Sequence, residues 1–436
     1  MIKKLFVIIL IPICSFTYAQ TIKTDVLVIG GNTIGIACAV QCARSKVKTV
    51  LVEARSILAD NLPPGDSYTI NSNKSIPSGT WGEFRARIRD FYKGKAGYDT
   101  TYNGSLKFER TAAQYILKKV TDTVKNLTIY LNSSFAAIKK DGDRWEVTVS
   151  QNKKTIVFKA RVIVDATETG GVAAKVNAKF KAGIDINQAG PNGYRTAIAA
   201  GDNFPVQVSL PNNYPPPPAW YICLKSVVLK DAENILVTQV MPTEKTAELL
   251  PVQFQLGQGI GTIAAYCAFF KTTTKNLKVR VIQGELLDYK GYILPFTDIS
   301  PRDPSWRAVQ QVCATGLLKG VRSNAQFKFE PDAWVLTAEV KPVLTEIYTR
   351  AFLWFAKEKP GEKFTLGNLL SFISDYTLTD PQTLHITMQK AWKTQYKFAG
   401  DFDLARPVTR REFAVLTNKF LNPFARTVDL EGRLVN

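Results

Sequence analysis

The chain has 436 residues, with 56 Lys or Arg, 37 Asp or Glu and a single His, so its formal net charge is +19 at pH 7. One histidine argues against Ser-His-Asp hydrolysis, Cys-His catalysis and histidine-rich metal sites. The basic residues form no long run, which favours a solvated surface over attraction to an anionic surface polymer or membrane, and no nucleic-acid partner is expected.

Residues 1–19 have the anatomy of a secretory signal peptide. Lys3 and Lys4 precede an apolar stretch, and Ala19 offers a small residue before a cut ahead of Gln20. An uncleaved anchor is the alternative, but the stretch is shorter than the roughly 20 residues that a bilayer requires. We therefore predict an exported chain, periplasmic or extracellular, with no transmembrane span after cleavage. The five cysteines that would remain are odd in number and lack a CxxC pair, which argues against a disulfide framework or a metal site.

Residues 24–53 read as a strand, a glycine turn, a helix and a second strand that ends in an acid. The apolar run Val26 to Ile29 is typical of a strand covered on both faces. Gly30 and Gly35 stand at the first and third positions of a dinucleotide-binding fingerprint, Asn32 replaces the second glycine, and Glu53 lies where an acid accepts from a ribose hydroxyl. Asparagine tolerates a left-handed backbone and can donate to a phosphate, so the pattern predicts a dinucleotide site, with a plain glycine turn as the alternative.

The next segments extend this unit. A loop over residues 60–79 precedes a helix that we expect to begin with a capping box of Thr80 and Glu83. A second helix is predicted over 112–124 and a strand over 127–131. Three short extended segments follow, at 135–140, 145–150 and 155–159, whose turn signals predict an antiparallel meander.

After the meander the chain returns to a buried strand at residues 162–164, followed by the segment Asp165-Ala-Thr-Glu-Thr-Gly-Gly. A strand is then predicted over 234–240, and residues 251–265 read as a glycine-rich helix start centred on Gly257 to Gly261. Residues 183–232, rich in Asn, Gly and Pro, leave room for only a small substrate-binding insertion. Tyr194 and Arg195 in that insertion are the strongest candidates for catalytic residues, although no acid or base can be assigned.

The last third of the chain changes character. The segment from Phe296 to Glu339 looks like one S-layer-homology-type repeat, and a partial second copy ends at Arg406 to Ala414. Such modules can bind a cell-surface polymer. A helical brace against the rest of the chain is the alternative, and we favour it because a full array of three repeats is not evident.

Taken together, the segments VIGGNTIGIACA, SGTWGEFR, VDATETGG and LGQGIGTIAAY and the tail from Phe296 resemble exported bacterial FAD-dependent oxidoreductases, a group sometimes labelled xanthan-lyase-like. The resemblance implies a doubly wound α/β domain over 20–292 with an inserted antiparallel meander, and a mainly helical region over 293–436. It also implies non-covalent FAD and a small, carbohydrate-derived substrate. The residues it assigns to the cofactor are Gly30, Gly31, Asn32, Thr33, Ile34, Gly35, Glu53, Ala54, Arg55, Ala136, Ala166, Thr167, Gly257, Gln258, Gly259, Ile260 and Gly261.

The chain departs from this family at positions near the cofactor. Besides Asn32, residues 57–60 stand where the family carries Gly-Gly-Met, and Met241, Lys245 and Glu248 stand where it tends to carry His and Arg. Two rival functions therefore stay open. One is a non-catalytic relative that binds a surface glycan, and the other is a polysaccharide lyase that needs no flavin.

Overall fold

A computed structural model describes residues 20–60, 62–63, 65–179, 190–205, 214–241 and 246–435, so the predicted signal peptide lies outside the described residues. A five-stranded parallel sheet forms the centre of the molecule. Its strands, in spatial order, are β13 (Ile235–Val237), β10 (Val162–Asp165), β2 (Val26–Ile29), β3 (Thr49–Val52) and β6 (Leu127–Tyr130). The predicted doubly wound α/β class is thereby confirmed.

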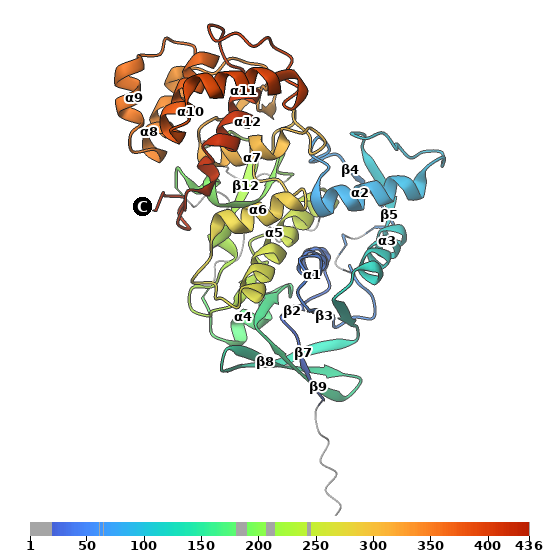
Figure 1. Cartoon of the computed structure of the whole chain (residues 1–436). Helices are drawn as coiled ribbons and strands as arrows, with labels where there is room; N and C mark the ends of the chain where they lie inside the picture. Colours follow the sequence, from blue (N-terminus) through green and yellow to red (C-terminus); the bar gives the residue numbers. More distant parts are fainter. Residues whose placement is uncertain are drawn as a thin grey trace, which may run out of the picture.

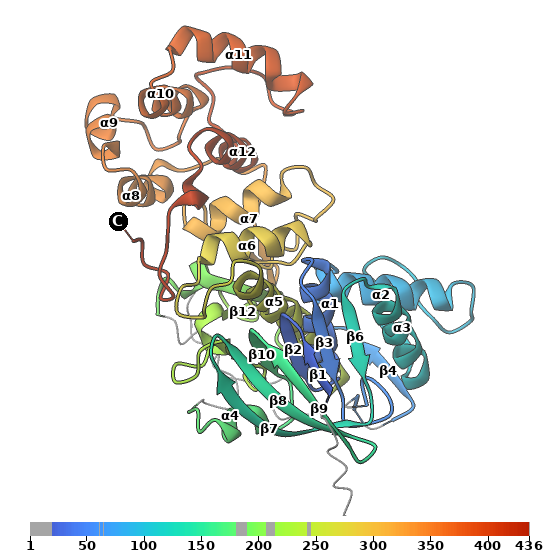
Figure 2. The ribbon, with the colours of Figure 1, turned by 60° about the horizontal axis from the view of Figure 1, so that its bottom comes forward.

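The sheet is buried on both faces, as the continuous apolar run of β2 predicts. Because side chains alternate along a strand, Val26 and Val28 face the helices, whereas Leu27 and Ile29 face a second sheet. That second sheet contains the predicted meander, formed by β7 (Ser133–Asp141), β8 (Arg144–Gln151) and β9 (Lys154–Ala160). β1 (Gln20–Lys23), which the sequence analysis did not predict, pairs with β9 in parallel. Figure 2 shows this second sheet in front of the parallel strands.

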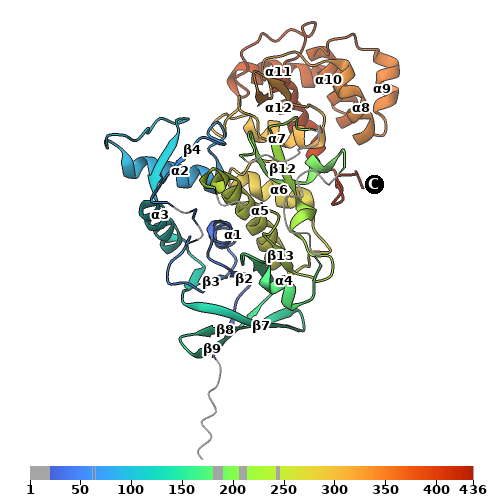
Figure 3. The same cartoon turned by 180° about the vertical axis from the view of Figure 1, so that it is seen from behind.

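Helices cover the other face of the parallel sheet, and Figures 1 and 3 both show α1 beside α5. The described α-helices before residue 290 are α1 (Thr33–Arg44), α2 (Gly79–Tyr92), α3 (Arg110–Thr123), α4 (Gly171–Lys175), α5 (Leu250–Phe269) and α6 (Val279–Asp288), of which α4 packs on the side of the meander. Three two-stranded ribbons complete the described strands: β4 (Ser67–Ile70) with β5 (Leu106–Glu109), β11 (Ala197–Gly201) with β12 (Trp220–Cys223), and β14 (Val321–Ser323) with β15 (Gln326–Lys328). Among the described residues, no helix is both long enough and apolar enough to cross a bilayer.

The structure corrects two predicted helix starts. α2 begins at Gly79 after Ser78, and Thr80 donates its hydroxyl to the Phe254 carbonyl instead of capping the helix. Glu83 forms ion pairs with Arg44 and Arg87. α5 begins at Leu250 with Pro251 in its first turn, so Gly257 to Gly261 lie inside the helix and not at its start.

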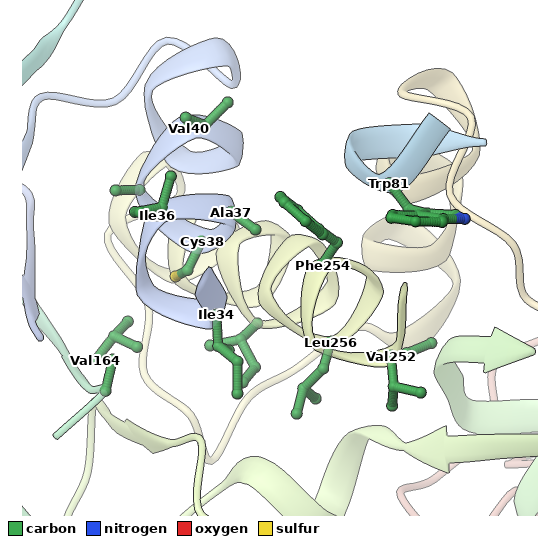
Figure 4. Packing of buried hydrophobic residues seen from close by; sticks show 14 of the residues in the cluster. Ile34, Ile36, Ala37, Cys38, Val40, Trp81, Val164, Val252, Phe254 and Leu256 are labelled. Carbon is green, nitrogen blue, oxygen red and sulfur yellow. The ribbon is translucent and has the colours of Figure 1, made fainter. Parts of the chain in front are cut away.

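The glycines of α5 allow close helix packing. A Cβ at Gly257 would lie 2.4 Å from the Ile34 carbonyl oxygen, and one at Gly261 would lie 2.6 Å from that of Cys38, both in α1. Gly259 faces the other side, where a Cβ would lie 2.4 Å from the Ile198 carbonyl oxygen of β11. Figure 4 shows Ala37 and Cys38 of α1 against α5. Backbone therefore meets backbone along the α1–α5 contact.

The C-terminal region is helical, as predicted, and lies at the opposite end of the molecule from the meander (Figure 1). It contains α7 (Trp306–Thr315), α8 (Thr337–Ile347), α9 (Ala351–Glu358), α10 (Leu366–Thr377), α11 (Pro381–Thr394) and α12 (Arg410–Phe420). The single histidine, His385, is on α11 and packs edge-on against Phe402.

Three buried residues just before α8, α10 and α12 form a closed ring of backbone hydrogen bonds. Phe364 N donates to Val335 O (2.9 Å), Val408 N to Phe364 O (2.9 Å) and Val335 N to Val408 O (3.1 Å). Side chains of Thr365 and Thr409 complete capping boxes at the starts of α10 and α12. The region thus has three equivalent helix starts around one centre, although only two repeat segments were visible in the sequence.

Buried polar contacts join this region to the remainder of the chain. Arg195, which is 3% exposed, donates two hydrogen bonds to the Glu346 carboxylate at 2.8 and 2.9 Å and one to the Gly432 carbonyl. Arg280 donates to the Arg195 carbonyl and lies over the Phe424 ring. Both terminal nitrogens of Arg195 are therefore used in contacts within the fold. Tyr194 beside it is buried in the hydrophobic core that also contains the C-terminal helices.

Candidate functional site

The order of the parallel strands reverses between β2 and β10, because the chain proceeds from β2 to β3 and β6 on one side and from β10 to β13 on the other. Ligands of open parallel sheets bind at the carboxyl ends of the strands at such a point. A cleft of about 210 Å³ lies there. It is lined by Ile29, Gly30, Asn32, Val52, Glu53, Ala54, Arg55, Ser133, Phe135, Ala166, Thr167 and Glu168.

Glu53 borders the cleft at the end of β3. Its Oε2 accepts from the Gly31 N–H at 2.5 Å and its Oε1 from the Arg55 N–H at 2.8 Å. A carboxylate has about four acceptor positions, so both oxygens retain capacity for a further donor. A side chain that is 8% exposed yet borders a cleft can therefore receive a ribose hydroxyl.

Gly30 and Gly35 satisfy the first and third requirements of the fingerprint. Gly30 has φ +115°, and a Cβ there would lie 2.2 Å from the Ala166 carbonyl oxygen. A Cβ at Gly35 would lie 2.0 Å from the Gly30 carbonyl oxygen. No larger residue fits either position, and the start of α1 is consequently held against the end of β2 at the cleft.

Asn32 occupies the second glycine position as the N-cap of α1, with φ −73°, so the left-handed backbone that asparagine tolerates is not used. Its Oδ1 accepts from the Gly35 N–H at 2.9 Å, and its Nδ2 donates to the Ala166 carbonyl at 2.6 Å. The carboxamide thus joins the turn after β2 to the turn after β10. It takes one of the free N–H groups that a diphosphate would use at a helix start.

The turn after β10 is fixed by Asp165. Its carboxylate accepts from the Thr167 N–H and hydroxyl, and from the N–H groups of Val172 and Ala173 at the start of α4. Burial raises the pKa of Asp165, an effect that these four hydrogen bonds oppose. Gln239 Nε2 donates to the Thr167 carbonyl at 2.6 Å. Ala166 and Thr167 are therefore held rigidly at one wall of the cleft.

Seven of the predicted cofactor residues line the cleft: Gly30, Asn32, Glu53, Ala54, Arg55, Ala166 and Thr167. Gly31, Thr33, Ile34 and Gly35 shape the turn and the first turn of α1 without lining it. Ala136 is exposed at an irregularity of β7, and its neighbour Phe135 lines the cleft in its place. Gly257, Gln258, Gly259, Ile260 and Gly261 lie buried within α5, where close packing accounts for the glycines.

Two family departures have structural roles. Leu58 and Ala59 are buried, and a Cβ at Gly31 would lie 2.8 Å from Leu58 Cδ2, so the segment over 57–60 packs onto the glycine turn. The Glu248 carboxylate accepts from the N–H groups of Asn71 and Ser72. Met241 is buried, and Lys245 lies outside the described residues.

Sequence reasoning missed Asp202, which follows β11. Its N–H donates to Asn73 Oδ1 at 3.0 Å, and its buried Oδ1 has no hydrogen-bond partner among the described residues. Burial raises its pKa to about 6. Only a signal for tertiary burial could have identified this residue, because its neighbours in sequence are those of an ordinary loop.

Asp202→Asn should stabilise the protein at neutral pH. A carboxyl whose pKa is raised on folding keeps its proton up to a higher pH in the folded chain than in the unfolded chain. The free energy of unfolding therefore falls as pH rises from about 4 to 6 and is constant above that range. We expect the substitution to add about 2 kcal/mol at about pH 8 and to remove this dependence. Urea titrations at several pH values measure both. The exposed Asp332 provides the control Asp332→Asn, and equal pH profiles for the native chain and Asp202→Asn would refute the assignment.

The parallel sheet, the meander over one face and the cleft at the switch point define a dinucleotide-binding fold of the Rossmann type. Residues 25–198 match the sequence model of the FAD dependent oxidoreductase family. The match supports that family for this part of the chain and indicates FAD as the cofactor. No curated protein matches the chain.

Several solved structures share segments with this chain at low identity. L-proline dehydrogenase from P. horikoshii aligns at 18% identity over 34% of this chain and 23% of its own, with a TM-score of 0.22. p-Nitrophenol 4-monooxygenase PnpA from Pseudomonas putida aligns at 17% identity over 37% of this chain and 44% of its own, with a TM-score of 0.27. Bacillithiol disulfide reductase from Bacillus cereus aligns at 20% identity over 33% of this chain and 40% of its own, with a TM-score of 0.24. This chain spans less than half the length of each.

Proposed function

We propose that the chain is an exported FAD-dependent oxidoreductase that acts on a small, carbohydrate-derived substrate. The observation that carries the redox part is the Glu53 carboxylate beside Gly31 in a cleft at the switch point, within the segment that matches the family. The apolar leader over 1–19 supports export. The sequence has no second glycine fingerprint for a nicotinamide cofactor, which supports direct electron transfer between substrate and flavin.

The donor and acceptor set fits the adenosine end of FAD. Glu53 would accept from the ribose, and the turn from Gly30 to Gly35 would face the diphosphate, next to the Asn32 carboxamide. Ala166 and Thr167, held by Asp165, would form the opposite wall. Arg55, which pairs with Asp60 and Glu168, lies at the rim. Bound FAD would supply reversible acceptance of two electrons from the substrate, and these residues would bind and orient it.

Purified mature chain should carry FAD or take it up. We expect a visible flavin absorption band, and saturable quenching of added FAD fluorescence at about one FAD per chain. The variant Glu53→Ala should bind FAD at least about tenfold more weakly, because the ribose loses its acceptor. A colourless protein that fails to take up FAD would contradict the proposal, and circular dichroism of the variant controls for misfolding.

A surface-binding protein without redox chemistry is the second candidate. The ring of Val335, Phe364 and Val408 gives the C-terminal region the three equivalent helix starts that an S-layer-homology-type module would need, and this supports binding of an anionic surface polymer by a basic chain. A colourless chain that sediments with isolated cell-surface polysaccharide favours this candidate. Release of an unsaturated sugar without flavin would favour the lyase instead.

A further inference from the structure

A second cavity, separate from the FAD cleft, lies where α2 begins. It measures about 340 Å³, within the range of about 300–1,000 Å³ typical of small-molecule sites. Four cationic side chains line it: Arg85, Arg89, Lys290 and Arg302. None of the described residues in its lining is acidic, and it shares no lining residue with the FAD cleft.

Arg85 is the central group of this cavity. The residue is 1% exposed, and its Nε and Nη2 both donate to the Tyr102 carbonyl, at 3.3 and 3.1 Å. Nη2 also donates to the Gly104 carbonyl, whereas Nη1 has no hydrogen-bond partner among the described residues. A buried charged donor that lacks a partner is unfavourable, so a ligand that accepts from Nη1 would be stabilised. Burial and the neighbouring charge of Arg89 lower the pKa of Arg85 to about 10, whereas Asp99 and Tyr102 act in the opposite direction. An anion in the cavity would act in the same direction as Asp99.

The start of α2 borders the same cavity. The helix has 14 residues and begins at Gly79, and Ser78 at its N-cap makes no side-chain cap. The Ser78 hydroxyl instead donates to the Lys290 carbonyl. Gln258 Oε1 accepts from the Thr80 N–H at 3.1 Å, which leaves the positive dipole end of the helix to favour an anion.

An aromatic side chain completes the wall. The guanidinium carbons of Arg302 and Arg89 lie 4.7 and 5.6 Å from the centroid of the Tyr102 ring. These cation–π contacts hold two charges near the cavity without neutralising them. No carboxylate pairs with Arg302 among the described residues, so its charge is available to a ligand.

We propose that this cavity binds a small organic acid by its oxyanion, a carboxylate or a phosphate or sulfate ester. Arg85 Nη1 and the start of α2 hold the anion, and Arg89, Lys290 and Arg302 attract it. The volume accommodates an organic body beyond the charged group, and the high net positive charge of the chain steers anions towards it. The site does not depend on FAD, so its test is independent of the redox proposal.

Isothermal titration calorimetry on the full mature chain tests this inference with four probes: sulfate, a hexose phosphate, a hexuronate and the matching neutral hexose. We expect saturable binding of the hexuronate or of the hexose phosphate, and none of the neutral hexose. Arg89→Gln and Arg302→Gln should each weaken binding about tenfold, because each removes a charge-assisted contact. Arg85→Lys keeps the charge but loses the planar fork, and should weaken binding at least as much.

Arg322→Gln is the matched control, since it removes the same charge from an exposed strand outside the cavity. Equal loss of affinity in the control and the cavity variants would show non-specific charge attraction and overturn the proposal. Absence of saturable binding by the native chain would do the same. Binding of sulfate alone, without any larger anion, would overturn the assignment of an organic acid. Arg302 is exposed, so its variant tests the site even if Arg85→Lys fails to fold.

Discussion

Replacing Gly257 by alanine should destabilise the folded chain by about 3 kcal/mol, although alanine is the better helix former by about 1 kcal/mol. The new Cβ would lie 2.4 Å from the Ile34 carbonyl oxygen and 2.7 Å from the Ala37 Cβ. Neither atom is the end of a flexible side chain, so α1 and α5 must move apart. Because Ile34 is in the first turn of α1, that movement also displaces the glycine turn, and we expect FAD binding to weaken together with stability.

Gly284→Ala is the matched control. Gly284 is in α6, and the nearest atom to a Cβ there is Arg307 Nη2 at 4.0 Å. This variant should gain up to about 1 kcal/mol, because a helical glycine is replaced without a clash. Urea denaturation followed by circular dichroism compares the two variants with the native chain. If Gly257→Ala matched Gly284→Ala in stability, the close α1–α5 contact would not be required by the fold.

The sequence predicted those parts of the fold whose signal is local. The apolar run at Val26 and the acid at Glu53 are spaced by one βαβ unit, and the positive φ of Gly30 and the contact of Gly35 with the Gly30 carbonyl are local requirements. The meander was visible because alternation and turn residues are also local. Seven of the residues that the sequence assigned to the cofactor therefore line one cleft in the structure.

The parts that were missed depend on partners distant in sequence. Gly257 and Gly261 looked like a helix start facing a flavin, but their carbonyl neighbours in α1 are more than 200 residues away. Pro251 in the first turn of α5 was the local sign of the true start. The ring of Val335, Phe364 and Val408 was hidden for the same reason, although Thr365 and Thr409, each with an N3 partner, mark two of its helix starts.

Asn32→Gly, which restores the second glycine of the fingerprint, should tighten FAD binding about tenfold. The substitution removes the carboxamide that joins Gly35 to Ala166, so the diphosphate can approach the backbone and use the N–H groups at the start of α1. Stability should fall by about 1 kcal/mol, mostly through loss of the hydrogen bond to the Ala166 carbonyl, since glycine is only slightly worse than asparagine at an N-cap. Quenching of FAD fluorescence measures the affinity, and urea denaturation the stability.

Asn32→Asp separates the size of this side chain from its charge. Aspartate has nearly the same shape and caps a helix as well as asparagine, but it cannot donate to the Ala166 carbonyl and it brings a negative charge towards the diphosphate. We expect it to bind FAD at least about tenfold more weakly than the native chain, which places the two variants about a hundredfold apart. If both variants bound FAD with the native affinity, the diphosphate would not lie at the start of α1. If the glycine variant bound more weakly, the Asn32 carboxamide would itself be a ligand of the cofactor, and the departure from the fingerprint would be an adaptation and not an obstacle.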